Sequence, residues 1–297
     1  MTQDDVHRRA RSPLYRDFFS QAEIDAQYDV PRSVEDPAPY RALLASKSAQ
    51  ARGLGSARLG LRFGPTEAEY LDVYPAGADA PALLFVHGGY WRASSAREHA
   101  YAALGPLTRG VTVVITNYAL CPDVDIAEIT RQSRAAAAWV WSHAQELGID
   151  RARIFAAGHS AGAQQVAMML GETPSRAAEL PPSVLQGGVG ISGIYDLRPL
   201  RHSFLQPALR LTEDSAARQS PLLHLPSRSA PLLVTVGSEE SDEFQRQSRD
   251  YAAARAGAEL PGSFSIQGGR NHYTIAADLA DPESSLCAEL FAWMGLA

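Results

Sequence analysis

The chain has 297 residues, a hydrophobic fraction of 45%, a charged fraction of 20% and a formal net charge of −6. This composition is typical of a globular protein and excludes a largely disordered chain. The acidic balance argues against a surface for nucleic acids. No stretch approaches the roughly 18 consecutive apolar residues that a membrane span needs, so we expect neither a nucleic-acid partner nor a membrane.

The N-terminus is acidic, and no apolar segment follows the pair Arg8 and Arg9. We therefore expect no export signal. The two cysteines, Cys121 and Cys287, lie in no metal-binding spacing, so we interpret them as free thiols in a reducing compartment. Both observations favour a cytoplasmic location.

Residues 1–55 are expected to form an N-terminal helical arm packed on the main domain. Ser20 and Glu23 have the spacing of a capping box, which predicts the start of a helix. Three prolines should divide the arm into short helices: Pro31, Pro37 and Pro39. The arm is rich in aromatic residues that could pack on the main domain, although a loosely docked tail is the alternative: Tyr15, Phe18, Phe19, Tyr28 and Tyr40.

The main domain is expected to span residues 56–297 and to begin with strands. Residues 57–63 and 69–74 alternate between apolar and other residues, which predicts an antiparallel pair. The continuous apolar runs at 81–86 and 111–116 predict strands buried on both faces, with a helix at 97–107 between them.

The second half of the chain continues the alternation of strands and helices. Strands are expected at 153–157, 184–191, 232–236 and 262–267, and helices at 126–147, 163–170, 242–256 and 282–294. This alternation predicts a mostly parallel central sheet with helices on both faces. Residues from about 192 to 226 are irregular and long for a connection, so we interpret them as a small lid insertion.

The pentapeptide GHSAG at 158–162 lies between a predicted strand and a predicted helix. This is the context of a nucleophile elbow, in which a serine occupies a strained turn and glycines allow the backbone to bend. The free N–H groups of the helix N-terminus then face the developing negative charge. Ser160 is the predicted nucleophile. The alternative is an ordinary glycine-rich turn with an incidental serine.

A serine nucleophile needs a base and an acid that orients the base. In elbow-containing sheets these follow the serine in the order acid, then histidine. His272 is the histidine that follows both a late strand and a carboxylate turn, so it is the predicted base. Glu240 is the predicted acid, with Asp242 as the second choice and Glu239 expected to be solvated.

A third group of residues, HGG at 87–89, follows a predicted buried strand. In elbow enzymes the oxyanion hole combines an amide from this early loop with the amide that follows the nucleophile. We therefore predict that the amides of Gly88, Gly89 and Ala161 bind the oxyanion. The alternative for the glycines is a plain tight turn.

These motifs together resemble the α/β-hydrolase type of kynurenine formamidase (arylformamidase). The resemblance runs from about residue 20 to 275 and rests on six stretches: HGGYW at 87–91, NYALCP at 117–122, GHSAG at 158–162, SGIYDL at 192–197, SPL at 220–222 and GSEESDEFQRQS at 237–248. The family usually has aspartate where this chain has Glu240, and proline where it has Asp242. It also usually has an acidic residue and a phenylalanine where this chain has Asn271 and Tyr273.

The resemblance implies an α/β-hydrolase fold and a serine hydrolase that removes the formyl group from an aryl formamide such as N-formylkynurenine, with no metal and no cofactor. The partner would be a small aromatic substrate, and a homodimer is compatible with the sequence. Five aromatic residues near the motifs are expected as substrate-binding wall residues, although each is equally well explained as core packing: Tyr90, Trp91, Tyr118, Tyr195 and Tyr273.

Two other functions fit the same residues. A carboxylesterase for short acyl esters would use the same triad and oxyanion hole. A non-catalytic binding protein of the same fold is the other alternative, but such proteins usually lack a triad residue and this chain retains all three.

Overall fold

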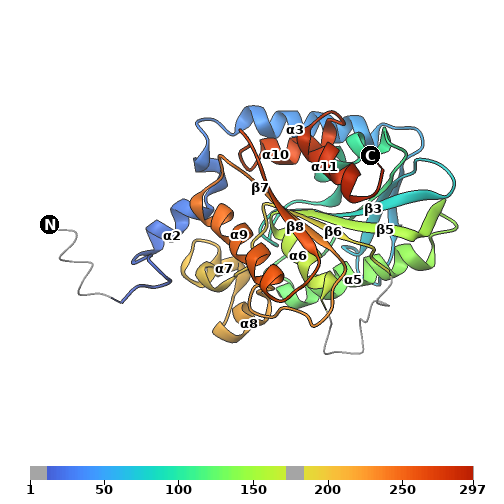
Figure 1. Cartoon of the computed structure of the whole chain (residues 1–297). Coiled ribbons are helices and arrows are strands. Elements are labelled where there is room, and N and C mark those ends of the chain that lie inside the picture. Colours follow the sequence, from blue (N-terminus) through green and yellow to red (C-terminus); the bar gives the residue numbers. More distant parts are fainter. Residues whose placement is uncertain (1–11, 172–183, 297) are drawn as a thin grey trace.

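A mostly parallel β-sheet runs through the centre of the molecule (Figure 1). The computed structural model describes residues 12–171 and 184–296. In these residues the sheet has eight strands in the order β1-β2-β4-β3-β5-β6-β7-β8. The strands are β1 (Arg58–Arg62), β2 (Tyr70–Tyr74), β3 (Ala80–Val86), β4 (Thr112–Thr116), β5 (Ile149–His159), β6 (Gly188–Ile191), β7 (Leu232–Gly237) and β8 (Gly262–Gln267).

The pairing of the strands determines where the chain can build a site. β2 pairs antiparallel with β1, as the alternating residues predicted, and also with β4, which they did not predict; all other neighbours in this sheet pair parallel. Because parallel strands point the same way, the carboxyl ends of β3, β5, β6, β7 and β8 lie along one edge of the sheet. The residues that follow these strands are therefore brought together.

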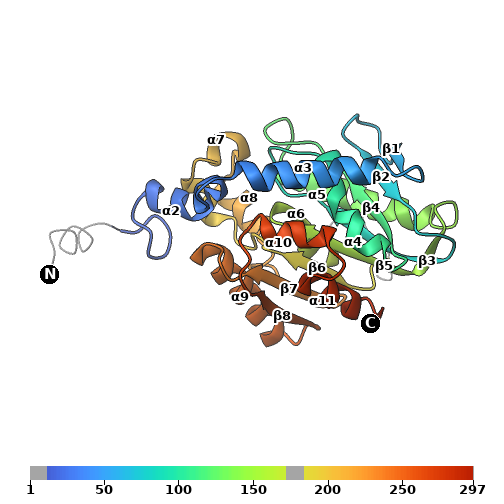
Figure 2. The same ribbon diagram turned by 90° about the horizontal axis from the view of Figure 1, so that it is seen from above.

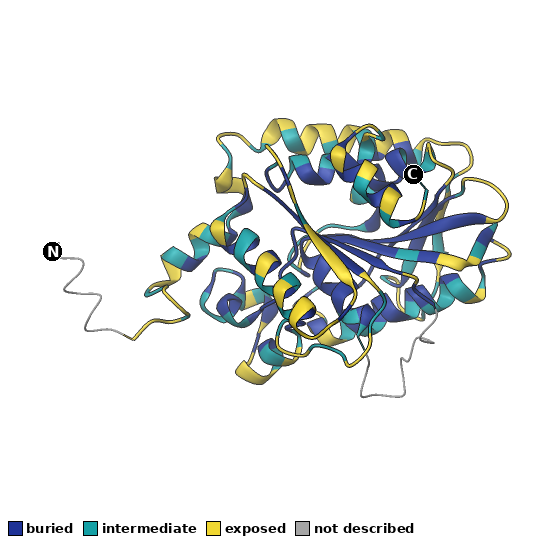
Figure 3. Cartoon of the chain, viewed as in Figure 1, coloured by how far each residue is buried: buried dark blue, intermediate teal, exposed yellow. Residues whose placement is uncertain are grey.

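Helices cover both faces of the sheet, which confirms the predicted fold class. In β3, Leu84 and Val86 belong to the core on one face, and Leu83 and Phe85 to the core on the other, because successive side chains of a strand alternate. Figure 1 shows the two helix layers, and Figure 2 looks down on one of them. Figure 3 shows the inner strands buried between the layers, whereas the edge strand β8 is mostly exposed. One layer contains α5 (Ile126–Ser142), α6 (Ala161–Leu170) and α9 (Asp242–Gly257), and the other contains α3 (Ala38–Arg52), α10 (Thr274–Ala277) and α11 (Ser285–Trp293).

Several element boundaries differ from the sequence-based prediction. Residues 184–187 lie outside β6 although Val184 and Leu185 are buried, because an apolar run reports burial rather than strand structure. The predicted helix at 126–147 ends at Ser142. The predicted helix at 97–107 is a 3₁₀-helix, η2 (Ala96–Ala103), followed by the single turn α4 (Leu104–Leu107).

The N-terminal arm contains α2 (Gln21–Tyr28), the 3₁₀-helix η1 (Val30–Ser33) and α3. The predicted capping box at the start of α2 is present: the Ser20 hydroxyl accepts from the Glu23 amide, and the Glu23 carboxylate accepts from the Ser20 amide. Pro37 and Pro39 lie at the start of α3, where a missing N–H removes no intrahelical bond. Consequently, α3 is longer than the short helices expected. Residues 1–11, with Arg8 and Arg9, lie outside the described residues.

Buried polar contacts attach the arm to α9 and to the segment after β6. The Tyr28 hydroxyl accepts a hydrogen bond of 2.7 Å from the side-chain amide of Gln247 on α9. The Tyr15 hydroxyl donates to Asp196 at 2.6 Å, and Arg198 forms an ion pair with the same carboxylate at 2.7 Å. α2 is thereby held beside the carboxyl edge of the sheet.

Residues 192–226, predicted as a lid insertion, contain three short helices: η4 (Arg198–His202), α7 (Gln206–Leu209) and α8 (Glu213–Arg218). Leu197, Leu200 and Leu205 are fully buried, so the segment is well packed. Its role as a lid stays a prediction. A further short 3₁₀-helix, η5 (Asp278–Ala280), joins α10 to the C-terminal part of the chain. Among the described helices, none is long and apolar enough to span a membrane.

Candidate active site

Ser160 lies on a sharp turn between β5 and α6. Its backbone has φ 57° and ψ −120°, a conformation that is strained for any residue except glycine. A Cβ atom at Gly158 would lie 2.3 Å from the carbonyl oxygen of Gly162, and one at Gly162 would lie 2.0 Å from that of Val86. Only glycine fits at either position, so the two glycines of GHSAG permit the turn that presents Ser160 at the sheet edge.

The loop after β3 lies against Ser160. A Cβ atom at Gly88 would be 3.2 Å from the Cβ of Ser160, so the Gly88 backbone is next to the serine side chain. Gly89 has φ +115°, and a Cβ there would be 2.2 Å from the carbonyl oxygen of Ala93. The loop therefore turns back tightly beside Ser160. That the amides of Gly88, Gly89 and Ala161 bind an oxyanion stays a prediction.

His272 and Glu240 form a buried pair at the same edge of the sheet. The Nδ1 of His272 is 2.6 Å from the Oε2 of Glu240, and both residues are buried. Glu240 follows β7 and His272 follows β8, as the sequence predicted. Asp242, the second choice for the acid, is exposed, and so is Glu239.

Two rings hold the imidazole of His272 in place. The His159 ring, from the residue before Ser160, lies 4.4 Å from the His272 ring between centroids. The Phe244 ring of α9 lies on His272 at 4.5 Å. His272 therefore lies beside the serine turn, and the three residues predicted as a triad are at the same edge of the sheet. That they act as a catalytic triad stays a prediction.

The sequence reasoning missed Ser192, which touches the acid. Its hydroxyl donates to the Oε1 of Glu240 at 2.5 Å, and the Gly237 amide donates to the same oxygen at 2.8 Å. Ser192 opens the SGIYDL stretch that carries part of the family resemblance. That stretch was the available signal, but it gave no indication of this contact.

Three other histidines near the site are uncharged at neutral pH: His87 and His159, which are buried, and His99, which is partly buried. Burial, and next the neighbouring His99, lower the pKa of His87 to about 3. Burial and next His272 hold the pKa of His159 well below its usual value, and burial also lowers the pKa of His99. His159 is therefore a neutral packing residue of the elbow. Among the described residues, no group of three or more His, Cys, Asp or Glu side chains is arranged to hold a metal ion.

Three of the five predicted wall residues belong to the core. Trp91 is fully buried and its indole donates to the Gln164 side chain at 3.1 Å. Tyr118 is buried and stacks on His87 at 4.0 Å between centroids. Tyr195 is also buried and stacks on another core tyrosine. Because these three side chains are packed in the core, the structure favours the core-packing alternative for them, and a role in substrate binding stays a prediction.

The other two predicted wall residues, Tyr90 and Tyr273, are only partly buried and face the N-terminal arm. The Tyr90 hydroxyl donates to the backbone carbonyl of Tyr28 at 2.6 Å. The Tyr273 ring stacks on the Tyr40 ring, with centroids 5.5 Å apart and planes at 6°. Arm residues thus touch the chain neighbours of Gly89 and of His272. We name the four tyrosines, Tyr28, Tyr40, Tyr90 and Tyr273, the arm-side wall.

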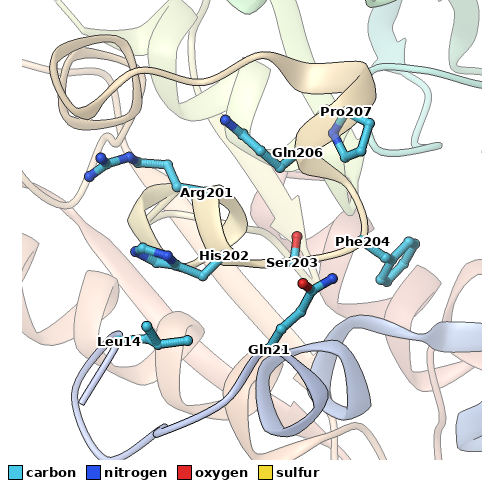
Figure 4. A pocket seen from close by; sticks show the side chains of 8 residues that line it. All are labelled: Leu14, Gln21, Arg201, His202, Ser203, Phe204, Gln206 and Pro207. Carbon is cyan, nitrogen blue, oxygen red and sulfur yellow. The ribbon is translucent and has the colours of Figure 1, made fainter. Parts of the chain in front are cut away.

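A cavity of about 380 Å³ lies beyond this wall, between the arm and the segment after β6 (Figure 4). Phe204 lines this cavity and also packs its ring against the Tyr90 ring, at 6.5 Å and 77°. The Phe204 amide donates to Asp25 of α2 at 2.7 Å. The residues that line the cavity are Leu14, Gln21, Arg201, His202, Ser203, Phe204, Gln206 and Pro207.

The fold and this geometry are those of a hydrolase, and sequence comparison places the chain in a family. Residues 83–275 match the family model of the alpha/beta hydrolase fold. The chain therefore belongs to the α/β hydrolases. It is an enzyme of the hydrolase class, with kynurenine formamidases and carboxylesterases among its relatives.

The chain is also similar to individual proteins, which include kynurenine formamidases and esterases. The chain is 32% identical to the kynurenine formamidase of Salmo salar over 83% of this chain and 85% of that protein. It is 30% identical to the kynurenine formamidase of Danio rerio over 93% and 97% of the two chains. The esterase LipC of Mycobacterium tuberculosis is 28% identical over 78% of this chain and 64% of its own length. A crystal structure from Silicibacter sp. TM1040, described as a candidate thioesterase, has 32% identity and a TM-score of 0.78, covering 90% of this chain and 98% of that one.

Proposed function

We propose that this protein is a serine hydrolase that removes the N-formyl group from aryl formamides such as N-formylkynurenine. One observation carries the proposal: the carboxylate–imidazole pair of Glu240 and His272 lies beside the strained turn of Ser160. The similarity to two kynurenine formamidases over most of the chain supports the choice of substrate.

The first half of the proposed reaction forms a formyl-enzyme. Since Nδ1 of His272 is bound to Glu240, its other ring nitrogen takes the hydroxyl proton of Ser160. The serine oxygen bonds to the formyl carbon, and the carbonyl oxygen becomes an oxyanion bound by the amides of the Gly88–Gly89 loop and Ala161. The C–N bond then breaks, and His272 returns the proton to the leaving aryl amine.

The second half releases formate. A water molecule gives a proton to His272 while its oxygen bonds to the formyl carbon. The ester bond to Ser160 then breaks, the serine oxygen recovers the proton, and formate leaves. Glu240 stays ionised throughout and stabilises the imidazolium. This sequence needs no metal and no cofactor.

The surroundings of Ser160 support a small acyl group and an aromatic leaving group. The Gly88 backbone is so close to Ser160 that even a methyl group there would touch it, which leaves little room beside the nucleophile. The partly buried rings of Tyr90 and Tyr273, which follow the Gly88–Gly89 loop and His272 in the chain, offer aromatic surface, against which a flat aryl group can stack. We also propose a cytoplasmic location, supported by two free, buried cysteines, Cys121 and Cys287.

The second candidate function is a carboxylesterase for short acyl esters, favoured by the similarity to LipC. The test measures kcat/KM for N-formylkynurenine, with formate release as the readout, against p-nitrophenyl acetate. We expect N-formylkynurenine to be the better substrate. Efficient turnover of the ester with no formate release would establish the esterase instead.

A further inference from the structure

Ser192 occupies a backbone conformation that its side chain does not favour. It follows β6, is fully buried, and has φ 52°. Positive φ is uncommon for residues other than glycine, asparagine and aspartate. The Ser192 amide donates to the carbonyl oxygen of Thr235 at 2.8 Å, so the backbone is held firmly in this position. A glycine would adopt this positive φ with less strain. The presence of serine therefore indicates that its side chain has a role.

In the structure the Ser192 hydroxyl donates a hydrogen bond to the carboxylate of Glu240. The two oxygens of that carboxylate are divided between different partners. Oε1 accepts from the Ser192 hydroxyl at 2.5 Å and from the Gly237 amide at 2.8 Å. Oε2 is left to His272, at 2.6 Å. Two donors on one oxygen fix the rotation of the carboxylate and therefore the direction of the other oxygen.

A glutamate needs such support more than an aspartate does. Its longer side chain has an additional torsion, and the terminal torsion of glutamate is broad and poorly defined by the side chain itself. The backbone amide of Gly237 restricts the carboxylate from one side. The hydroxyl of Ser192 approaches from β6, the neighbouring strand in the sheet. Together they hold the carboxylate in the orientation that the imidazole requires.

We propose that Ser192 is a positioning residue for catalysis, whose hydroxyl fixes Glu240 so that Oε2 faces His272. This inference rests on the proposed function, since it requires that the Glu240–His272 pair activates Ser160. Ser192 itself would not touch the substrate. Removing its hydroxyl should therefore lower kcat and leave KM nearly unchanged.

Two substitutions separate the hydroxyl from the backbone. Ser192→Gly removes the hydroxyl and favours the positive φ, whereas Ser192→Ala removes the hydroxyl and keeps the strain. We expect both to lower kcat by ~10- to 100-fold, the effect of losing a hydrogen bond to a charged group. KM should stay within about twofold, as expected when only transition-state stabilisation is lost. The Gly variant should unfold at a higher temperature than Ser192→Ala, because glycine favours the positive φ. Melting curves check that both variants are folded at the assay temperature, so that unfolding does not explain their loss of activity.

Ser248→Ala provides a matched control. Ser248 is also fully buried, and its hydroxyl has no hydrogen-bond partner among the described residues. This variant should keep the wild-type kcat. If Ser192→Gly also keeps it, Ser192 serves only the backbone turn and the inference is wrong.

A double-mutant cycle tests whether Ser192 acts through the acid. In a Glu240→Gln background, Ser192→Gly should lower kcat by less than about twofold, because the carboxylate it positions is already gone. A loss that multiplies with that of Glu240→Gln would contradict the inference. Such a result would mean that the serine acts independently of Glu240.

The rate of labelling by a fluorophosphonate probe keeps this inference separate from the choice of substrate. The probe reports on the reactivity of Ser160 whichever acyl group the enzyme prefers. If Glu240→Gln does not slow labelling, the proposed triad itself fails. If Glu240→Gln slows labelling and Ser192→Gly does not, the triad stands and only the role of Ser192 is refuted.

Discussion

The proposed catalytic centre and the arm-side wall are built in different ways. The centre gathers Ser160, Glu240 and His272 from the ends of β5, β7 and β8, and all three are buried. The wall joins Tyr28 and Tyr40 of the arm to Tyr90 and Tyr273, which follow the oxyanion glycines and the base. Residues next to the chemical groups thus depend on a segment more than 60 positions away in the chain, since Tyr90 binds Tyr28 at a separation of 62. The comparison indicates that the sheet supplies the chemistry and the arm shapes its surroundings.

The largest effect should come from the centre. Ser160→Ala should lower kcat by ~10⁶-fold, the scale seen when a triad serine is removed. The temperature of thermal unfolding should change little, because the variant keeps the Cβ atom of Ser160 and removes only its hydroxyl. Steady-state kinetics and a melting curve check both statements. Turnover close to that of the wild type would remove Ser160 from the mechanism.

The acid should give the next largest effect and distinguish two neighbouring carboxylates. Glu240→Gln should lower kcat by ~10⁴-fold, because an amide favours the wrong tautomer of the histidine. Asp242→Asn, at an exposed position on the same turn, is the matched control and should be nearly silent. A greater loss from Asp242→Asn would reverse the two assignments.

A substitution of Trp91 tests whether this residue belongs to the core or to the arm-side wall. It adjoins Tyr90 in sequence, but it is fully buried and bound to Gln164. Trp91→Ala should therefore destabilise the protein by about 3–5 kcal/mol, as for other buried tryptophans. Denaturant unfolding measures this loss. Unchanged stability together with a lost preference for aryl substrates would instead make Trp91 part of the wall.

The buried histidines of the centre should make stability depend on pH. Because their pKa values are lowered in the folded protein, with that of His87 at about 3, they stay neutral there, while the unfolded chain takes up protons below about pH 6.5. Stability should be complete above about pH 6.5 and fall as the pH decreases below it, by about 1.4 kcal/mol per pH unit for His87 until its folded-state pKa of about 3 is reached, with further losses from His159 and His99.

Urea unfolding at pH 7, 6 and 5 would show this slope. His87→Asn should make it shallower by one histidine, and His224→Asn, at an exposed position, should leave it unchanged. Equal slopes in the wild type and His87→Asn would mean that His87 is protonated in the folded protein at these pH values.

How far the sequence predicted this site depends on the kind of information each residue needed. That Ser160, Glu240 and His272 lie at one sheet edge could be predicted, because the carboxyl ends of parallel strands meet there and each residue follows such a strand; their catalytic roles stay a prediction. The contact of Ser192 with Glu240 could not be predicted, because it requires β6 to neighbour β7 and the serine to adopt a positive φ. Neither property is encoded in a local pattern.

The aromatic residues are a second case in which a local sequence pattern does not predict the contacts of a side chain. Trp91 and Tyr90 are adjacent in the sequence and chemically alike, yet one packs on Gln164 and the other on the arm. Their partners lie 73 and 62 positions away, so only the tertiary structure separates core from wall. The lengths of α3 and β6 were mispredicted for a similar reason. An apolar run can be buried without forming a strand, as before β6, and a proline can begin a helix as well as break one, as in α3.

The smallest effect should come from the arm-side wall, and it should depend on the substrate. Tyr90→Phe removes one hydroxyl and its hydrogen bond to the Tyr28 carbonyl. A neutral hydrogen bond of this kind contributes about 1 kcal/mol to stability, so kcat/KM for aryl formamides should fall by at most about fivefold, the value reached if the whole bond serves to orient the substrate. If the wall orients the aryl group, aliphatic formamides should be affected less. Tyr74→Phe is the control, because the buried Tyr74 hydroxyl has no partner among the described residues. Equal losses for aryl and aliphatic formamides would show that Tyr90 supports the oxyanion loop rather than the substrate, and the arm would then belong to the catalytic centre.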